Sequence, residues 1–133
     1  MSLVRAGPAR STSGVMEHDV YFSWSDFDLA VLYLAEGLEG LDFDSIYGIP
    51  RGGLVLAVTL SHQLCKPLTL IPDRRTLVVD DISDSGRTLQ RLKVSPACTA
   101  TIHYVPGSAY KPTVWALYKS PGTWIVYPWE RPF

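Results

Sequence analysis

Two adjacent carboxylates and a group of small hydroxyl residues stand close together in the middle of the chain. An apolar run ends at Asp80 and Asp81. Ser85, Gly86 and Thr88 follow within a few residues, where an apolar-periodic segment begins. Carboxylates are hard oxygen groups that suit Mg²⁺ or sugar hydroxyls, whereas hydroxyls and the free N–H groups at a helix start suit a phosphate. The spacing therefore predicts one site for a ligand that carries a sugar, a phosphate and a metal ion.

The turn Pro50-Arg51-Gly52-Gly53 is a second candidate for anion binding. Taken alone it reads as an ordinary turn. It lies, however, between a strand predicted at 45–49 and an apolar helix predicted at 54–64, and a glycine-rich turn from strand to helix can bind an anion through its backbone N–H groups. If both strands belong to one parallel sheet, both turns lie at the same edge of that sheet. Together the two turns predict one composite site.

Hydrophobic periodicity predicts the elements that position these turns. Apolar residues recur at helical spacing over 26–37, and Ser25 with Asp28 has the spacing of a capping box. Further helices are predicted at 54–64, which is nearly all apolar in its first two turns and should be buried, and at 89–94. Strands are predicted at 45–49, 68–71, 76–80, 99–105 and 113–118. The alternation predicts an α/β fold: a small doubly wound, mostly parallel sheet with flanking helices and with ligands at the carboxyl ends of its strands.

Length and charge narrow the classes of protein that fit. A chain of 133 residues suits one domain, predicted at 16–133, with ordered structure from about Tyr21. Residues 1–15 contain Gly, Pro, Ser and Thr without hydrophobic periodicity, which predicts a mobile N-terminal arm. The formal net charge of −1 gives no electrostatic case for binding nucleic acid.

The sequence indicates neither a membrane protein nor a secreted one. No apolar run approaches the roughly 20 residues that cross a bilayer, and the N-terminus lacks the charged-then-apolar order of a secretion signal. Cys65 and Cys98 show no metal or redox spacing, which predicts a reduced chain in the cytoplasm. His18, His62 and His103 are scattered without metal-ligand spacing, so none is assigned a site.

Residues 78–88, Val-Val-Asp-Asp-Ile-Ser-Asp-Ser-Gly-Arg-Thr, closely resemble the phosphoribosyl-pyrophosphate (PRPP) signature of the type I phosphoribosyltransferases. A receiver domain also clusters acids at strand ends, but its acids lie near the start of the domain and a later strand supplies a lysine. The resemblance implies that Asp80 and Asp81 hold the ribose hydroxyls, directly or through Mg²⁺. It assigns the 5-phosphate to the turn made of Ser85, Gly86, Arg87 and Thr88.

The same resemblance assigns roles at the earlier turn and beside the signature. Arg51 and Gly52 would bind the pyrophosphate of PRPP, and the peptide bond between Pro50 and Arg51 would be cis. Asp84 would lie near the incoming base as the catalytic residue. A carboxylate there can take the N7 proton of a purine as the base attacks the sugar, or stabilise the charge that develops on the ring.

The C-terminal segment 124–130 resembles the end of the bacterial xanthine-guanine and archaeal 6-oxopurine phosphoribosyltransferases. The resemblance implies that Trp124 stacks on the purine, that the backbone of Ile125 reads its edge, and that Ile82 packs against the other ring face. The competing interpretation of Trp124 is a core tryptophan, the commoner fate of this residue type. Trp129 and Glu130 are expected to be packing and surface residues.

The chain departs from this family at two places. The connection 72–75 is too short for the mobile lid that covers PRPP in related enzymes and excludes water, so the lid is reduced. Val105-Pro106 stands where related sequences have the Lys-Pro whose lysine binds the 6-oxo group of the base. Lys111 is expected to be a surface lysine. Arg74 and Arg75 are expected in solvent, with a smaller chance of facing the pyrophosphate.

The leading hypothesis is a Mg²⁺-dependent purine phosphoribosyltransferase that uses PRPP, with a 6-oxopurine as the favoured base, in purine salvage. The short connection and the absent lysine motivate an alternative, a PRPP- or nucleotide-binding module with little or no catalytic activity. An unrelated doubly wound phosphate-binding domain is a third, weaker possibility. The resemblance also implies a homo-oligomer.

Overall fold

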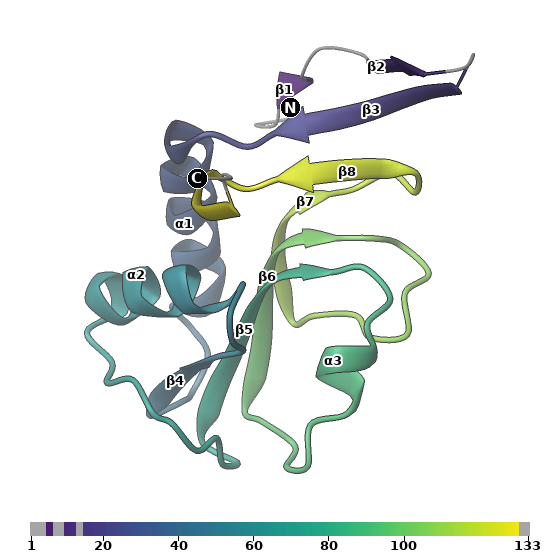
Figure 1. Cartoon of the computed structure of the whole chain (residues 1–133). Helices are drawn as coiled ribbons and strands as arrows, with labels where there is room; N and C mark the ends of the chain where they lie inside the picture. Colours follow the sequence, from purple (N-terminus) through teal and green to yellow (C-terminus); the bar gives the residue numbers. More distant parts are fainter. Residues whose placement is uncertain (1–4, 7–9, 13–14, 131–133) are drawn as a thin grey trace.

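The computed structural model describes the backbone of residues 5–6, 10–12 and 15–130, and the side chains from Asp19 onward. Its centre is a parallel sheet in the order β4 (Ser45–Gly48), β5 (Thr76–Ser83), β6 (Cys98–Tyr104) and β7 (Val114–Tyr118), as Figure 1 shows. Every residue of β6 is buried, as expected of a strand covered on both faces. The predicted mostly parallel α/β sheet is confirmed.

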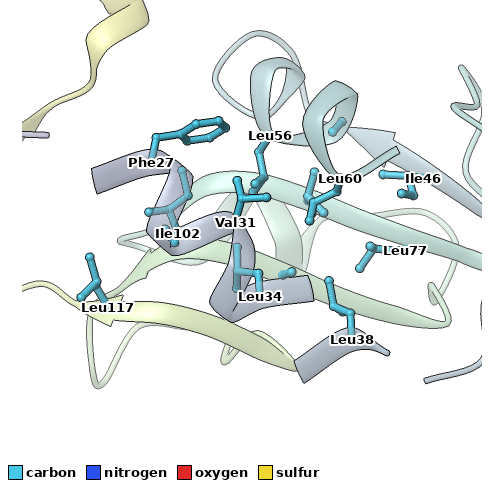
Figure 2. Packing of buried hydrophobic residues seen from close by; sticks show 14 of the residues in the cluster. Phe27, Val31, Leu34, Leu38, Ile46, Leu56, Leu60, Leu77, Ile102 and Leu117 are labelled. Atoms are coloured by element: carbon cyan, nitrogen blue, oxygen red, sulfur yellow. The ribbon is translucent and has the colours of Figure 1, made fainter. Parts of the chain in front are cut away.

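Helices α1 (Trp24–Leu38) and α2 (Leu54–Leu64) cover one face of this sheet. Their apolar stripes meet the sheet in one core, drawn in Figure 2, which includes Phe27, Val31, Leu34, Leu56, Leu60, Leu77 and Ile102. The short helix α3 (Arg87–Gln90) lies on the opposite face, where Leu89 packs against Val78 and Ile49. Helices therefore flank both faces, although α3 is a single turn and ends before the predicted 94.

The helix boundaries follow from capping and from the position of the sheet. The capping box of α1 is formed by Ser23 and Asp26, with Asp26 N donating to Ser23 Oγ over 3.0 Å, so the predicted box at Ser25 and Asp28 is wrong. The helix starts earlier because this box places the buried Phe27 in its first turn. The predicted bounds of α2 are confirmed, but Leu54 and Val58 are exposed, because the sheet and α1 cover only part of the helix surface.

The strand predicted at 68–71 does not form. Only Leu68 pairs, through a single parallel bridge to Ile46, and Leu70 is 92% exposed. The Thr69 hydroxyl hydrogen bonds with the backbone of Ile71, which turns the chain away from the sheet. The segment fails as a strand because it lies outside the edge strand β4 with no layer to cover its apolar side chains.

The bridge at Leu68 nevertheless reveals where the order of the strands reverses. From β4 the chain passes through α2 to Leu68 at the outer edge of β4, and then returns to β5 on the inner side. In an open parallel sheet, such a reversal leaves a crevice outside the carboxyl ends of the two strands it separates. The turns that follow β4 and β5 border this crevice.

A second, smaller sheet lies beyond the carboxyl ends of the central strands (Figure 1). In it β3 (Val15–Tyr21) pairs in parallel with β8 (Thr123–Val126), and β1 (Arg5–Ala6) and β2 (Arg10–Thr12) pair antiparallel to β3. Ordered structure thus starts before Tyr21, contrary to the prediction, because β8 takes β3 as its partner. The predicted arm 1–15 lies partly outside the described residues, and its mobility stays a prediction.

The described part of the chain ends in a short 3-10 helix, Pro128–Glu130, which follows β8. Among the residues described, no helix combines the length and the apolar character needed to cross a membrane.

Candidate functional site

The turn that follows β4 contacts the end of β5 at the crevice. Ile49 N donates to Val79 O over 2.9 Å, and Gly53 N donates to Ile49 O over 2.8 Å, so the first turn is anchored to β5. At Gly52 an added Cβ would lie 2.7 Å from Asp81 Cγ, which leaves room only for glycine beside that carboxylate. The Pro50–Arg51 peptide is cis, as the sequence predicted.

Asp80 and Asp81 form a half-buried pair at the end of β5. The Asp81 N–H donates to Asp80 Oδ1 over 2.9 Å, and burial together with the charge of Asp81 raises the pKa of Asp80 to about 8. Burial also raises the pKa of Asp81. The two acids lie within β5, which runs three residues past the predicted end at Asp80, because Asp80 and Ile82 remain paired with β6.

This donor set suits a divalent cation. A bound cation would offset the repulsion within the acid pair, and carboxylate oxygens are the ligands that Mg²⁺ takes. In the described part of the chain, no cluster of three or more His, Cys, Asp or Glu could hold a metal ion. Mg²⁺ commonly binds through one or two carboxylates and completes its shell with water and phosphate oxygens, so two acids beside a phosphate site fit this ion.

The loop after β6 packs against the predicted phosphate turn and hydrogen bonds to it. Ala109 N donates to Ser85 O over 2.8 Å, and Gly86 has a φ of 78° and no room for a side chain beside Ala109 N. Ser85 and Thr88 are exposed. Because α3 is a single turn, its dipole is small, and an anion here would depend on the backbone N–H groups and hydroxyls of the turn itself.

A cavity of about 100 Å³ adjoins the acid pair, between β5, the end of β7 and β8. It contains all three predicted base-binding residues and the predicted catalytic acid: its lining is Asp81, Ile82, Asp84, Lys119, Trp124, Ile125, Tyr127 and Glu130. A larger hollow of about 530 Å³ between α1 and the edge strand β7 lies away from these polar groups.

The two tryptophans of the C-terminal segment differ in environment. Trp124 is 66% exposed, so it is not a core residue, and its ring can be covered by a ligand. Trp129 packs against the core and stacks on Tyr127, with ring centroids 5.0 Å apart. The prediction of a packing role for Trp129 is confirmed.

Lys119 is a residue of this cavity that the sequence analysis missed. It directly follows β7, its side chain is buried, and its Nζ lies 3.4 Å from Asp84 Oδ2. A signal was present, because a polar residue directly after a parallel strand lies at the edge of the sheet where ligands bind. Lys111, by contrast, is exposed with its Nζ 5.4 Å from the centroid of the Trp115 ring, so its prediction as a surface lysine is confirmed.

Three further side chains support the cavity. The Tyr127 hydroxyl donates to Asp81 O over 3.3 Å and lies 2.8 Å from His103 Nδ1. Burial, and to a lesser extent the charge of Lys119, lowers the pKa of His103 to about 4. Glu130 is exposed, as predicted, but it also lines the cavity. Its Oε1 accepts a hydrogen bond from Tyr127 N over 3.0 Å, which fixes the chain after β8.

The arginines before β5 lie at the opposite edge of the sheet. Arg75 precedes the first residue of β5 and pairs with Asp42 at 2.9 Å and Asp44 at 3.0 Å. Arg74 is exposed at the same end. The smaller expectation that they face the pyrophosphate is wrong, because β5 separates them from the crevice along its length.

Comparisons with known proteins agree with this geometry. No protein-family model matches the sequence. The xanthine-guanine phosphoribosyltransferase of Cereibacter sphaeroides is 26% identical over 147 residues, covering 86% of this chain and 88% of that protein. The crystal structure of the purine phosphoribosyltransferase of Pyrococcus horikoshii matches with a TM-score of 0.74 and 32% identity, over 86% of this chain and 96% of that one. The Helicobacter pylori xanthine-guanine-hypoxanthine phosphoribosyltransferase matches in fold with a TM-score of 0.70 at 23% identity, over 85% of this chain and 94% of that one.

Proposed function

Because the chain belongs to the type I phosphoribosyltransferase family, we propose that it transfers the 5-phosphoribosyl group of PRPP to a purine base and releases pyrophosphate. The observation that carries the proposal is the contact between the turn that follows β4 and the acid pair at the end of β5, with an open cavity beside them. Two separate phosphate turns next to an acid pair suit a ligand with two phosphate ends and a sugar between them.

Each part of the crevice takes one part of PRPP in this proposal. The exposed turn at 85–88 binds the 5-phosphate, and Asp80 and Asp81 bind the ribose hydroxyls. Arg51 and the backbone of Gly52 bind the pyrophosphate. Mg²⁺, held by Asp80 and Asp81, would offset the negative charge of the diphosphate as it leaves.

The chemistry at the sugar is a displacement at the anomeric carbon. A ring nitrogen of the purine forms the new bond to C1 of the ribose, and the bond from C1 to the pyrophosphate oxygen breaks with its electron pair on the oxygen. The transition state resembles an oxocarbenium ion, so fixed negative charge and exact positioning lower its energy. Asp84, which lines the cavity, accepts the ring proton that the base loses.

An activity assay tests the function. The full chain is incubated with PRPP, Mg²⁺ and guanine, xanthine, hypoxanthine or adenine in turn, and nucleoside monophosphate and pyrophosphate are quantified. We expect both products in equal amounts with at least one base, and we expect loss of product when Mg²⁺ is chelated. No nucleotide from any of the four bases would contradict the proposal.

The exposed segment before β5 favours a second candidate, a PRPP- or nucleotide-binding module with little turnover. Between α2 and β5 the described chain has no strand pairing beyond the bridge at Leu68, and it leaves Leu70 and Ile71 exposed and provides no lid against water. Calorimetry that finds tight PRPP binding by a protein without turnover would support this candidate. A neighbouring subunit could exclude water instead, and the homo-oligomer stays a prediction that light scattering can test.

A further inference from the structure

Packing does not explain why the charged side chain of Lys119 is buried in the wall of the cavity. The residue is 7% exposed, and lysine is almost never so buried unless it is paired. Taking a charge out of water is unfavourable unless a close partner compensates for the lost hydration. A lysine held in this place therefore needs a strong partner.

The described protein supplies only a weak partner. Among the side chains described, Asp84 alone bonds with the ammonium, and the Nζ to Oδ2 distance is 3.4 Å. A charge-assisted hydrogen bond between such groups is normally about 2.7–2.9 Å long. The Asp84 side chain is also 57% exposed, so water screens its charge. An ammonium has three donors and no acceptor, so the bond to Asp84 leaves two donors without a partner among the described side chains, and Lys119 lines the cavity.

No other described side chain is hydrogen-bonded to the ammonium. The carboxylates of Asp81 and Glu130 also line the cavity, but neither forms an ion pair with Lys119, and the rest of the wall is the apolar Ile82 and Ile125 and the aromatic Trp124 and Tyr127. The neighbouring His103 is fully buried, and its Nε2 has no hydrogen-bond partner among the described residues. The missing partner is therefore a ligand atom that accepts hydrogen bonds.

The position of Lys119 in the sheet says which end of a purine it meets. Tyr104 of β6 pairs with Tyr118 of β7, and Lys119 N donates to Tyr104 O over 3.0 Å, so Lys119 lies beside Val105, where related sequences carry lysine. From Asp81 on β5 to Lys119 after β7 is two strand spacings, about 10 Å across the sheet. The ribose and the five-membered ring occupy the Asp81 end of this gap, which places the six-membered ring at the lysine.

We propose that Lys119 donates a hydrogen bond to the 6-oxo group of the base and thereby selects 6-oxopurines against adenine. This inference rests on the proposed function and names the class of its acceptor. Adenine carries an amino group at the same position, so a donor would face a donor and both would stay buried without a partner. A site built to bond one polar group discriminates strongly against an analogue that lacks it.

Steady-state kinetics with Lys119→Met and Lys119→Arg test the proposal. At saturating PRPP, kcat/KM is measured for hypoxanthine, guanine and adenine. We expect Lys119→Met to lower kcat/KM for both 6-oxopurines by about 10- to 150-fold more than for adenine, which corresponds to the loss of one hydrogen bond to a charged group. Lys119→Arg should retain part of the preference, because the guanidinium also donates. Lys111→Met is the matched control at an exposed lysine and should leave all three values unchanged.

The ratio between bases separates recognition from a structural role. A lysine that only supports the fold would change kcat/KM for all three bases by the same factor, and that result would overturn the proposal. Should the parent chain turn over no base, the proposed function fails and binding decides the inference: calorimetry compares IMP with AMP. Tighter binding of IMP that Lys119→Met abolishes would then support the role of Lys119, and equal binding of both nucleotides by the parent chain would refute it.

Discussion

Replacing glycine by alanine at Gly52 tests whether the position of the Asp81 carboxylate is needed for PRPP. The added Cβ would lie 2.7 Å from Asp81 Cγ and 2.9 Å from its Oδ1. These atoms end a side chain, so the carboxylate can rotate away with little loss of stability, but it then leaves its place beside Asp80. We expect the free energy of unfolding to change by less than about 1 kcal/mol. We expect the dissociation constant of PRPP to rise about tenfold or more, which corresponds to about 1.4 kcal/mol.

Two other glycines provide the controls for this variant. At Gly53 an added Cβ would lie 2.5 Å from Val79 O and 2.8 Å from Ile49 N, which are backbone atoms that cannot rotate away. Gly53→Ala should therefore lose about 1–3 kcal/mol of stability or more. At Gly40 no heavy atom lies within 4 Å of the added Cβ, so Gly40→Ala should be neutral or gain up to about 1 kcal/mol from a less flexible unfolded chain.

The assay combines urea unfolding, followed by circular dichroism, with calorimetric titration of PRPP in the presence of Mg²⁺. Parent-like PRPP affinity in a folded Gly52→Ala variant would refute the assignment of Asp81 to the ligand. Equal stability of Gly53→Ala and Gly40→Ala would refute the packing of the first turn against β5.

Three further predictions concern the base, the acid and the core. Asp84→Asn should lower kcat by about 10²- to 10⁴-fold with little change in calorimetric PRPP affinity, and an equal loss of both would exclude its role as the base. Trp124→Ala should raise KM for the base about 10-fold, as expected for about 1–3 kcal/mol of stacking. It should not lower the unfolding midpoint, because the side chain is 66% exposed. A large loss of stability would show instead that Trp124 packs in the core. Burial lowers the pKa of His103 from 6.5 to about 4, so the unfolded chain binds more protons than the folded one between these pH values. The free energy of unfolding should therefore fall by about 3 kcal/mol as the pH falls through that window. His103→Gln should show a shallower fall in denaturant titrations at pH 7 and 4.5, and the same slope in both proteins would show that His103 is not the titrating group.

The sequence pattern correctly predicted the elements that depend on nearby residues or on apolar residues at a regular spacing. The helix at 54–64 was placed residue for residue, and the strands at 45–49, 76–80, 99–105 and 113–118 were found with small errors at their ends. Such elements can be predicted because their apolar residues face one layer and therefore recur at a fixed spacing in the sequence. The cis peptide at Pro50–Arg51 was predicted from the family resemblance and confirmed.

Elements that depend on a distant partner were the ones predicted wrongly. The segment 68–71 has the composition of a strand, yet it lies outside β4 with no covering layer and keeps only the bridge at Leu68. In contrast, β3 begins within a segment without clear periodicity, because β8, far along the chain, pairs with it. Neither outcome is encoded within a short window of sequence.

By itself, the sequence determined the chemistry of this protein: an acid pair, a phosphate turn and a second glycine-rich turn, each a local pattern with a local physical cause. Only the tertiary structure decided how these groups share a crevice, that Trp124 stays exposed, and that Lys119 lies beside Val105 and lines the cavity. The reason is that burial and neighbourhood at a sheet edge arise from strand order and register. Those depend on contacts between residues far apart in the chain, which no single segment specifies.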